Sequence, residues 1–422
     1  MSDTIYALSS GAPPAAIAVV RISGPRADAA VMALAGRLPE PRRAALVTLR
    51  SAGEELDRAL AIRFPGPDSA TGEDIAELHL HGGRAVVAAV LAALGAIDGL
   101  REAEPGEFTR RAFEKGRIDL AEAEGLADLL VAETQAQRRA AQALAGGLLS
   151  RQVEAWRGQV LALSAAAEAA LDFSDEGDVE EETGARIADT ATALEQEISA
   201  ALSRPPAERL RDGVRVAIAG PPNAGKSTLL NALTQRDAAI ISPLAGTTRD
   251  LIEAPVAISG VPIVLIDMAG LRESEDTIEQ IGVARARDAI GAADLILWLG
   301  PPEGAPEGSV RVQAKADIAT SRQDCDLAVS AVTGAGLPEL ARLIVDRSRL
   351  LLPGPDEVRL NTRHRVELCE CVAALGEVRS NADLLIVAEA LRRARLALDR
   401  IAGRAGGEDM LDTLFGRFCI GK

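Results

Sequence analysis

The 422-residue sequence is poor in aromatic residues, and it has fewer basic than acidic residues. Phe, Trp and Tyr make up 2% of the chain, too few for wide surfaces on which single-stranded bases stack. We therefore expect cores built from aliphatic side chains. Acidic residues outnumber basic ones by 62 to 46, a formal net charge of −16, so the chain as a whole should repel nucleic acid. Solubility alone also explains a net charge of this size.

Cysteine is scarce as well. The four cysteines are too few and too unevenly spaced for a disulfide framework. The longest uncharged run, from Thr4 to Val20, contains Gly11, Pro13 and Pro14, and it follows Asp3 instead of a basic segment. It therefore fits neither a signal peptide nor a membrane span. We expect a cytoplasmic protein in a reducing compartment, with no membrane contact.

The first quarter of the chain, residues 1–116, mixes strand and helix patterns. Residues 75–81 alternate apolar and polar side chains and predict a half-buried strand. From 117 to 210 the composition is that of long helices. Gly146 and Gly147 predict a break there, and the acidic run from Asp172 to Glu182 predicts a loop.

A phosphate-binding pattern follows. Residues 214–219 predict a strand, residues 220–227 read Gly-Pro-Pro-Asn-Ala-Gly-Lys-Ser, and a helical stretch begins at Thr228. In this order, backbone N–H groups and the helix N-terminus face the phosphates of a nucleotide. Lys226 would neutralise the β and γ oxygens, and the Ser227 hydroxyl would bind Mg²⁺.

Two further motifs lie downstream at the spacing of switch loops. The sequence Gly-Thr-Thr-Arg-Asp at 246–250 supplies the Thr248 hydroxyl for the metal, and an apolar strand at 263–266 leads into Asp267-Met-Ala-Gly270. Asp267 would hold the water shell of Mg²⁺, and Gly270 would donate its N–H to the γ-phosphate. Each motif is weak alone, but their order after the glycine loop indicates a GTPase with two switch loops.

The base-recognition motif departs from the usual pattern. Guanine-selective enzymes of this class carry Asn-Lys-x-Asp, whereas residues 314–317 read Ala-Lys-Ala-Asp. Asp317 would still accept two hydrogen bonds from guanine, and Lys315 would lie over the base. We expect a preference for GTP with affinity weakened by about 1 kcal/mol, for one missing hydrogen bond. Ser330 and Ala331 fit the last base-contacting loop.

The nucleotide-binding pattern occupies residues 211–352, and residues 353–422 return largely to helical composition rich in arginine. We expect the second helical stretch to pack on the first. The predicted fold class is α/β plus all-α: an N-terminal α+β domain, a discontinuous helical domain, and an inserted P-loop domain of the Ras-like GTPase type.

The chain resembles the MnmE (TrmE) family of tRNA modification GTPases over almost its whole length. Besides the motifs above, the resemblance rests on Arg21-Ile-Ser-Gly, Thr71-Gly-Glu-Asp, His81-Gly-Gly, Pro105-Gly-Glu-Phe-Thr and the ending Phe418-Cys-Ile-Gly-Lys422. It implies a folate-binding and dimerisation domain, a helical domain of two separated stretches, and a GTPase domain between them. The expected boundaries are 1–116, 117–210, 211–352 and 353–422.

The resemblance also implies a reaction. Members of this family form homodimers and work with the flavoprotein MnmG, in a heterotetramer, to build the carboxymethylaminomethyl group on the wobble uridine (U34) of certain tRNAs. A reduced folate, 5-formyl- or methylene-tetrahydrofolate, supplies the one-carbon unit. tRNA would be bound through the complex, with MnmG presenting much of the basic surface.

Four residues would contact the folate by this resemblance: Arg21, Glu77, Arg117 and Lys422. The family usually has Lys at position 117, and a guanidinium still binds a carboxylate or carbonyl. Taken alone, without the resemblance, Glu77 is better explained by an ordinary solvated strand face. His79 and His81 share that face, and two histidines without a third ligand are interpreted as surface residues and not as a metal site.

Hydrolysis in this family needs no arginine finger. A K⁺ ion held by Asn223, Ser242, Leu244 and Thr247 would bridge the phosphates, take the place of a guanidinium and promote contact between two GTPase domains. Ser227 and Thr248 would hold Mg²⁺. Glu279 would orient the attacking water, although a carboxylate that opens the next helix explains the same residue.

The complete predicted GTP site is Asn223, Ala224, Gly225, Lys226, Ser227, Thr228, Ser242, Thr247, Thr248, Asp267, Gly270, Lys315, Asp317, Ser330 and Ala331, with Glu279 and Lys226 as the catalytic residues. The alternative function is a nucleotide-switched assembly factor for ribosomes or other particles. Such a factor would share the GTPase domain but would not need Arg21, Glu77 or Lys422. Cys419 is either a nucleophile or a small side chain that shapes the folate pocket, and no neighbouring base can be named from sequence.

Overall fold

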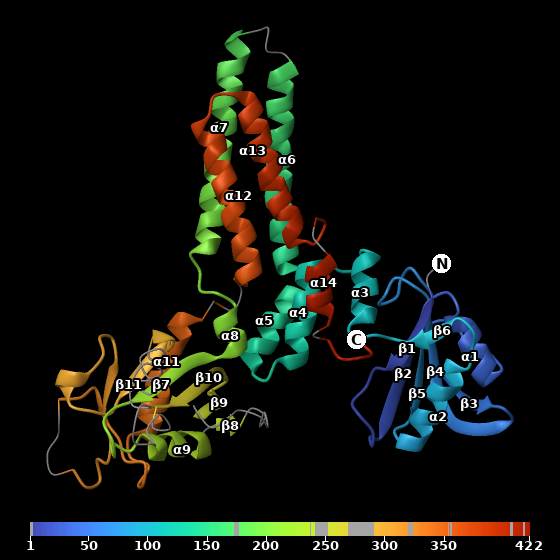
Figure 1. Cartoon of the computed structure of the whole chain (residues 1–422), viewed down its shortest axis with the longest axis horizontal. Helices are drawn as coiled ribbons and strands as arrows, with labels where there is room; N and C mark the ends of the chain where they lie inside the picture. Colours follow the sequence, from blue (N-terminus) through green and yellow to red (C-terminus); the bar gives the residue numbers. More distant parts are fainter. Residues whose placement is uncertain are drawn as a thin grey trace, which may run out of the picture. The chain divides into compact units, whose positions relative to one another are not determined.

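The computed structural model describes residues 3–172, 177–236, 238–240, 252–268, 291–319, 324–352, 354, 357–405, 408–416 and 418–422. The chain divides into two compact units. The first joins Met1–Ala127 to Asp399–Lys422, and the second is Asp128–Leu398. The end of the chain, which the sequence analysis assigned to the helical domain, thus groups with the N-terminal residues. Figure 1 labels most elements of both units.

A mostly antiparallel sheet forms the centre of the first unit. Its strand order is β3-β4-β5-β2-β1-β6, and the β1–β6 pair is parallel. The strands are β1 (Thr4–Leu8), β2 (Ile17–Ser23), β3 (Ala45–Ser51), β4 (Glu54–Phe64), β5 (Ile75–His81) and β6 (Leu100–Glu102). The half-buried strand predicted at 75–81 is confirmed, and its alternate residues Ala76, Leu78 and Leu80 are buried.

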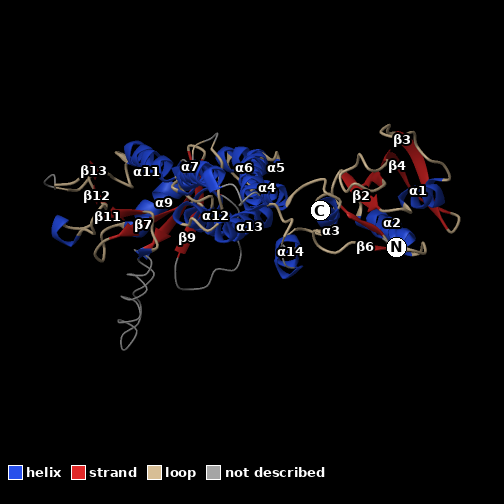
Figure 2. Cartoon of the chain, turned by 90° about the horizontal axis from the view of Figure 1, so that it is seen from above, coloured by secondary structure: helices blue, strands red, loops and turns tan. Residues whose placement is uncertain are grey.

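Two helices cover one face of this sheet (Figure 2). α1 (Ala27–Ala35) and α2 (Arg84–Gly95) pack their apolar side chains against Ala76, Leu78 and Leu80 and the matching residues of neighbouring strands. Successive side chains of a strand point to opposite faces. Arg21, Glu77 and His79 therefore lie on the face that α1 and α2 do not cover.

The C-terminal residues pack within this first unit. α14 (Glu408–Phe415) contacts α3 (Glu107–Glu114). Phe415 lies between Phe113 and Phe418, with ring centroids 6.0 and 6.2 Å away, respectively. Half of the six aromatic side chains of this unit are thus used to fix the chain end.

The last residues reach the first strand. Ile420 forms a β-bridge with Pro105. A Cβ added to Gly421 would lie 2.2 Å from the Leu8 carbonyl oxygen, so the backbone passes β1 at a distance that a side chain would prevent.

A second sheet carries the nucleotide-binding pattern. Its order is β13-β12-β11-β7-β10-β9-β8. Neighbours from β13 to β10 are parallel, and β9 and β8 continue the sheet in antiparallel pairs. The strands are β7 (Val214–Ala219), β8 (Ala238–Ile240), β9 (Ile252–Ile258), β10 (Val261–Asp267), β11 (Leu295–Trp298), β12 (Val310–Gln313) and β13 (Leu327–Ala328). The strands predicted before the glycine loop and before Asp267 are both confirmed.

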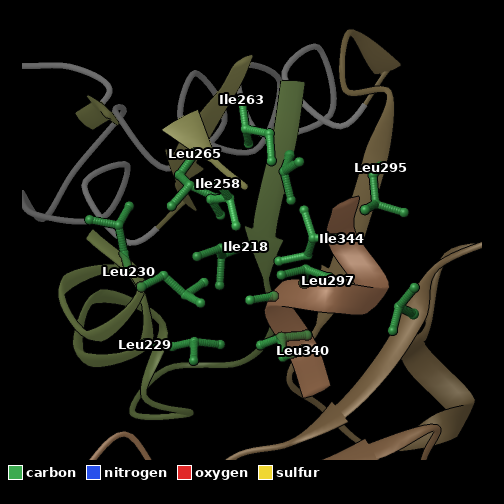
Figure 3. Packing of buried hydrophobic residues seen from close by; sticks show 14 of the residues in the cluster. Ile218, Leu229, Leu230, Ile258, Ile263, Leu265, Leu295, Leu297, Leu340 and Ile344 are labelled. Atoms are coloured by element: carbon green, nitrogen blue, oxygen red, sulfur yellow. The ribbon is translucent and has the colours of Figure 1, made fainter. Parts of the chain in front are cut away.

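The core around this sheet is aliphatic, as the composition predicts. α9 (Lys226–Arg236) contributes Leu229, and α11 (Leu337–Leu351) contributes Leu340 and Ile344. Figure 3 shows these side chains gathered around Ile218 and Leu297 of the central strands. The buried members of this cluster in the described chain are all Val, Ile, Leu or Ala.

Helices from before and after the nucleotide-binding segment pack on each other. α7 (Gly177–Leu202) contacts both α6 (Leu148–Asp172) and α12 (Thr362–Ser380), as Figure 1 shows. Trp156 on α6 donates its indole N–H to Glu197 on α7 at 2.8 Å. The other helices of this part of the chain are α4 (Leu120–Val131), α5 (Gln135–Ala145), α8 (Glu208–Asp212) and α13 (Leu384–Ile401).

One expectation about these helices is wrong. The acidic run from Asp172 to Glu182 was expected to form a loop, but α7 already begins at Gly177. Acidic residues are typical both of helix N-termini and of loops, so an acidic run by itself does not distinguish the two. The break at Gly146 and Gly147 is confirmed, since α5 ends at Ala145 and α6 begins at Leu148.

No helix in the described ranges is both long and apolar enough to cross a membrane.

Candidate functional site

The glycine loop at 220–227 joins β7 to α9, as predicted. Gly220 has a φ of +147°, and a Cβ there would lie 3.0 Å from the backbone of Leu299, so this position requires glycine. Lys226 is 8% exposed, and its Nζ donates to the carbonyls of Gly220 at 3.1 Å and Pro221 at 3.0 Å. The ammonium therefore lies inside the loop, beside the positive end of the α9 dipole, where phosphate oxygens bind.

Asp267 lies at the same edge of the sheet as the glycine loop. It ends β10, which pairs in parallel with β7 and places Asp267 opposite Ile218. The carboxyl ends of neighbouring parallel strands meet at one edge, which is where α/β proteins bind ligands. Asp267 is 2% exposed, and Ser227 stands in the first turn of α9. The structure thus brings the predicted Mg²⁺ residues Ser227 and Asp267 to one edge.

The predicted base-binding segments also meet the glycine loop. Lys315, which follows β12, donates from Nζ to the carbonyl of Asn223 at 2.7 Å. The backbone N–H of Ala316 donates to the carbonyl of Val329 at 3.0 Å, which joins residues 314–317 to the segment that holds Ser330 and Ala331. Asp317 is exposed beside them. These two hydrogen bonds therefore link the glycine loop to the segments predicted to bind the base.

Part of the predicted GTP site lies outside the described residues. These positions are Ser242, Leu244, Thr247, Thr248, Gly270 and Glu279. They include every proposed K⁺ ligand except Asn223, and the catalytic glutamate, so these assignments stay predictions. Within the described ranges, no group of three or more His, Cys, Asp and Glu residues is arranged to hold a metal ion.

A second polar site lies on the face of the N-terminal sheet opposite α1 and α2, where Phe108 of α3 also packs on β1. The register of β2 and β5 sets Arg21 opposite Glu77. Arg21 donates from Nε at 3.1 Å and from Nη2 at 2.9 Å to Oε1 of Glu77. Its guanidinium lies 5.8 Å from the centre of the Phe108 ring, a cation–π distance. Arg21 and Glu77 are 23% and 17% exposed, so they form an oriented, half-buried pair and not an ordinary solvated strand face.

Arg117 and Lys422 belong to the same unit but contact other residues. Arg117 lies 3.6 Å from Asp68. Asp68 belongs to the segment that also contains Thr71, and the Thr71 hydroxyl lies 2.7 Å from the hydroxyl of Ser23 on β2. The backbone N–H of Lys422 donates to the carbonyl of Cys419 at 3.2 Å, in the turn that packs on β1. The structure thus joins Arg21 to Glu77 directly, whereas the contacts of Arg117 and Lys422 given above are with other segments of the same unit.

The four cysteines are free thiols. On α12, Cys369 is exposed and Cys371 is buried, as their spacing in a helix predicts. Burial raises the pKa of the Cys371 thiol to about 12, so this group is protonated and unreactive at neutral pH. Cys419 is exposed in the C-terminal turn.

Two contacts at these sites were missed by the sequence analysis. His79 Nε2 lies 3.2 Å from Oε2 of Glu77, whereas His79 was interpreted as a surface histidine. The alternation along β5 was the available signal, because it sets both residues on one face. The contact between Lys315 and Asn223 spans 92 positions, and no local pattern indicates it.

Comparison with known proteins covers both sites. A family model described as the MnmE helical domain matches residues 120–419, and one described as the GTP-binding protein TrmE N-terminus matches residues 4–117. A tRNA modification GTPase MnmE from Erythrobacter litoralis is 58% identical over 424 residues, covering 100% of both chains. Another from Rhizorhabdus wittichii is 60% identical over 427 residues, covering 100% of this chain and 97% of the relative.

Among solved structures, the G domain of the T. maritima FeoB iron transporter is 29% identical and covers 32% of this chain and 98% of that chain, with a TM-score of 0.24, which is too low to support an inference. The full-length relatives include both ends of the chain, which a GTPase domain alone would not require. They confirm the family that the motifs indicated. This chain therefore belongs to the MnmE family, and it is a GTP-hydrolysing enzyme of tRNA modification.

Proposed function

We propose that this enzyme is the GTP-hydrolysing component of the complex that adds a carboxymethylaminomethyl group to the wobble uridine U34 of certain tRNAs. A reduced folate, 5-formyl- or methylene-tetrahydrofolate, donates the one-carbon unit, and the flavoprotein MnmG is the partner. The observation that carries this proposal is the half-buried Arg21–Glu77 pair. It lies in a different unit from the glycine loop, and hydrolysis of GTP by itself has no use for it.

The polar groups of the N-terminal unit suit a folate. The edge of a pterin presents N–H donors, and a carboxylate such as Glu77 accepts one of them in a charge-assisted hydrogen bond. Arg117 and Lys422 would supply positive charge for the carboxylates of the folate tail. When bound, the folate supplies the one-carbon unit, while these four side chains bind and orient it.

The glycine loop and its neighbours suit GTP with Mg²⁺ and K⁺. Lys226 stabilises negative charge on the phosphates, and Ser227 with Thr248 would bind Mg²⁺. The backbone carbonyl of Asn223 already accepts from Lys315, so the exposed amide side chain is the group that would bind K⁺. Ser242, Leu244 and Thr247 would complete that site, and Glu279 would orient the attacking water.

The assembly follows from the same family. The enzyme would be a cytoplasmic homodimer that forms a heterotetramer with MnmG, and tRNA would be bound through the complex. The packing of α7 on α12 supports a GTPase domain, residues 211–352, inserted between helical stretches 117–210 and 353–422, after a folate-binding domain at 1–116. The net charge of −16 supports a basic tRNA surface on MnmG.

The test measures U34 directly. In cells whose gene is disrupted, mass spectrometry of tRNA nucleosides should show U34 without the carboxymethylaminomethyl group. The wild-type gene should restore it, as should Glu55→Gln, a control on the exposed part of β4. Glu77→Gln and Lys226→Ala should not restore it. Unaltered U34 in the disrupted strain would favour the particle-assembly function instead.

A further inference from the structure

The carboxylate of Glu77 is held from two directions. Arg21, from the neighbouring strand β2, donates twice to Oε1. His79, two residues along β5, has its Nε2 3.2 Å from Oε2. Glu77 and His79 are 17% and 27% exposed, so water competes with this contact less than it does at an open surface. In the sheet register His79 lies between Val19 and Leu60, whose apolar side chains border it.

The hydrogen-bonding capacity of Glu77 shows which oxygen meets a ligand. A carboxylate has about four lone-pair positions, two on each oxygen. Arg21 occupies both positions on Oε1, and His79 occupies one on Oε2 when Nε2 carries its proton. These contacts leave one position on Oε2. That position accepts an N–H from a ligand only if the carboxylate is held at one rotation about its terminal bond.

We propose that His79 is a positioning residue of the folate site. It donates from Nε2 to Oε2 of Glu77 and, together with Arg21, keeps the carboxylate in the orientation that accepts from the pterin edge. The inference rests on the proposed function, because it requires a folate at Glu77. His79 acts through Glu77 and not by touching the reacting atoms. Loss of one hydrogen bond to a charged group lowers affinity about tenfold.

His81, on the same face of β5, provides a comparison within the chain. It uses the opposite ring nitrogen: Nδ1 lies 2.7 Å from Oδ1 of Asp57, and the backbone N–H donates to Oδ2 at 2.8 Å. The side chain of His81 is 74% exposed, whereas that of Asp57 is 8% exposed. The two histidines thus bind different carboxylates, and His79 is the one that orients Glu77.

The experiment uses the position of the ring nitrogen. The amide nitrogen of glutamine stands as many bonds from Cβ as Nε2 of histidine does, and that of asparagine stands where Nδ1 does. His79→Gln should therefore bind 5-formyltetrahydrofolate within about twofold of wild type, and His79→Asn and His79→Leu about tenfold more weakly. Calorimetric titration of the full-length protein measures the affinities, with His81→Leu as a control that should bind normally. Thermal unfolding and GTP turnover confirm that each variant is folded.

The measured folate affinities test whether His79 positions Glu77. Equal affinities of the glutamine and asparagine variants, both normal or both weak, would overturn the positioning role of His79. If Glu77→Gln weakens binding while all three His79 variants bind normally, the folate site stands and His79 does not orient it. If wild type binds no folate, or Glu77→Gln binds it as well as wild type, the proposed function itself fails and this inference with it.

Discussion

Ala314 stands where guanine-selective GTPases carry asparagine, and its surroundings predict the effect of restoring the amide. The methyl group is half-buried, and a Cβ at Gly225 of the glycine loop would lie 3.8 Å from it. We expect Ala314→Asn to bind GDP and GTP more tightly by about 1 kcal/mol, or roughly fivefold, because the amide adds a hydrogen bond between neighbouring loops. Titration with a fluorescent GDP analogue measures this. Ala314→Leu, of similar size without the amide, should show no gain, and equal affinities of the two variants would contradict the explanation.

Asn223 allows the same kind of test for potassium. Its side chain is exposed, while its backbone carbonyl is engaged by Lys315. We expect GTP turnover to be faster in K⁺ than in Na⁺, and Asn223→Ala to lose K⁺-dependent turnover on the order of a hundredfold, as for removal of one group that stabilises a transition-state charge. Asn231→Ala, an exposed position on α9, is the control. A rate indifferent to the cation in wild type would remove K⁺ from the proposal.

Glu279 belongs to the part of the chain outside the described residues, so its role rests on the motif alone. If it orients the attacking water, Glu279→Ala should abolish GTP turnover and leave nucleotide affinity within a few fold, because water positioning contributes to the transition state and not to ground-state binding. Single-turnover hydrolysis and nucleotide titration separate these effects. An equal loss of both would refute the water-orienting role.

At the scale of elements, α3 is fixed to the N-terminal sheet by an ion-pair network centred on the buried Arg111. The Arg111 side chain is 9% exposed and lies 2.8, 3.1 and 2.8 Å from Asp3, Glu73 and Glu107, respectively. Arg111→Leu would leave the largely buried carboxylates of Glu73 and Glu107 without this partner and should lower the free energy of unfolding by about 3 kcal/mol, measured in urea. Arg110→Leu, on the same helix but with a side chain 34% exposed, should cost about 0.5 kcal/mol.

The same network predicts how stability depends on pH. Burial by itself raises the pKa of Asp3 and of Glu107, but hydrogen bonds from Arg101 and Arg111 outweigh it and hold both pKa values below their ordinary 3.8 and 4.5. A carboxylate with a lowered pKa stabilises the folded state above its unfolded pKa, and this contribution is lost as pH falls through the folded value. Thermal midpoints should therefore be level above about pH 5 and fall below about pH 4, and the fall should be smaller in Arg111→Leu. If the thermal midpoint falls equally at low pH in the wild type and in Arg111→Leu, this assignment is contradicted.

Local patterns predict the elements that local forces determine. The alternation of apolar and polar residues predicts β5, and the glycine loop predicts the connection between β7 and α9. Both predictions succeed because side-chain periodicity and breaker residues act within a few positions of the sequence. The start of α7 at Gly177 was missed because acidic residues favour a helix N-terminus and a loop alike. A composition-based boundary is therefore least certain where one residue type suits two structures.

At the scale of the whole molecule, the missed features are contacts between distant positions. Lys315 meets Asn223, and the C-terminal turn meets Leu8, without any signal in the neighbouring sequence. The motifs shared with the family indicate that both ends of the chain contribute to the folate site. They do not indicate which contacts bring the two ends together. These contacts depend on how segments that are distant in the sequence pack together in the fold, so no local sequence pattern predicts them.

The approach of the C-terminal turn to β1 gives the last prediction. Gly421 has a φ of +92°, and any Cβ would collide with the Leu8 carbonyl oxygen, so Gly421→Ala should displace the final residues and Lys422 with them. Since Arg21 lies on β2, which pairs with β1, a displaced Lys422 can no longer complete a site at Arg21. We expect folate affinity to fall about tenfold or more, as for deletion of residues 419–422.

GTP turnover is the control measurement for this experiment. The glycine loop belongs to the second unit, so Gly421→Ala should hydrolyse GTP at the wild-type rate when folate is absent. Gly11→Ala, in the same unit but with no atom within 4 Å of the added Cβ, should bind folate normally. If Gly421→Ala retained full folate affinity, the C-terminal lysine would have no part in the site, and the folate would have to be held by Arg21, Glu77 and Arg117 alone.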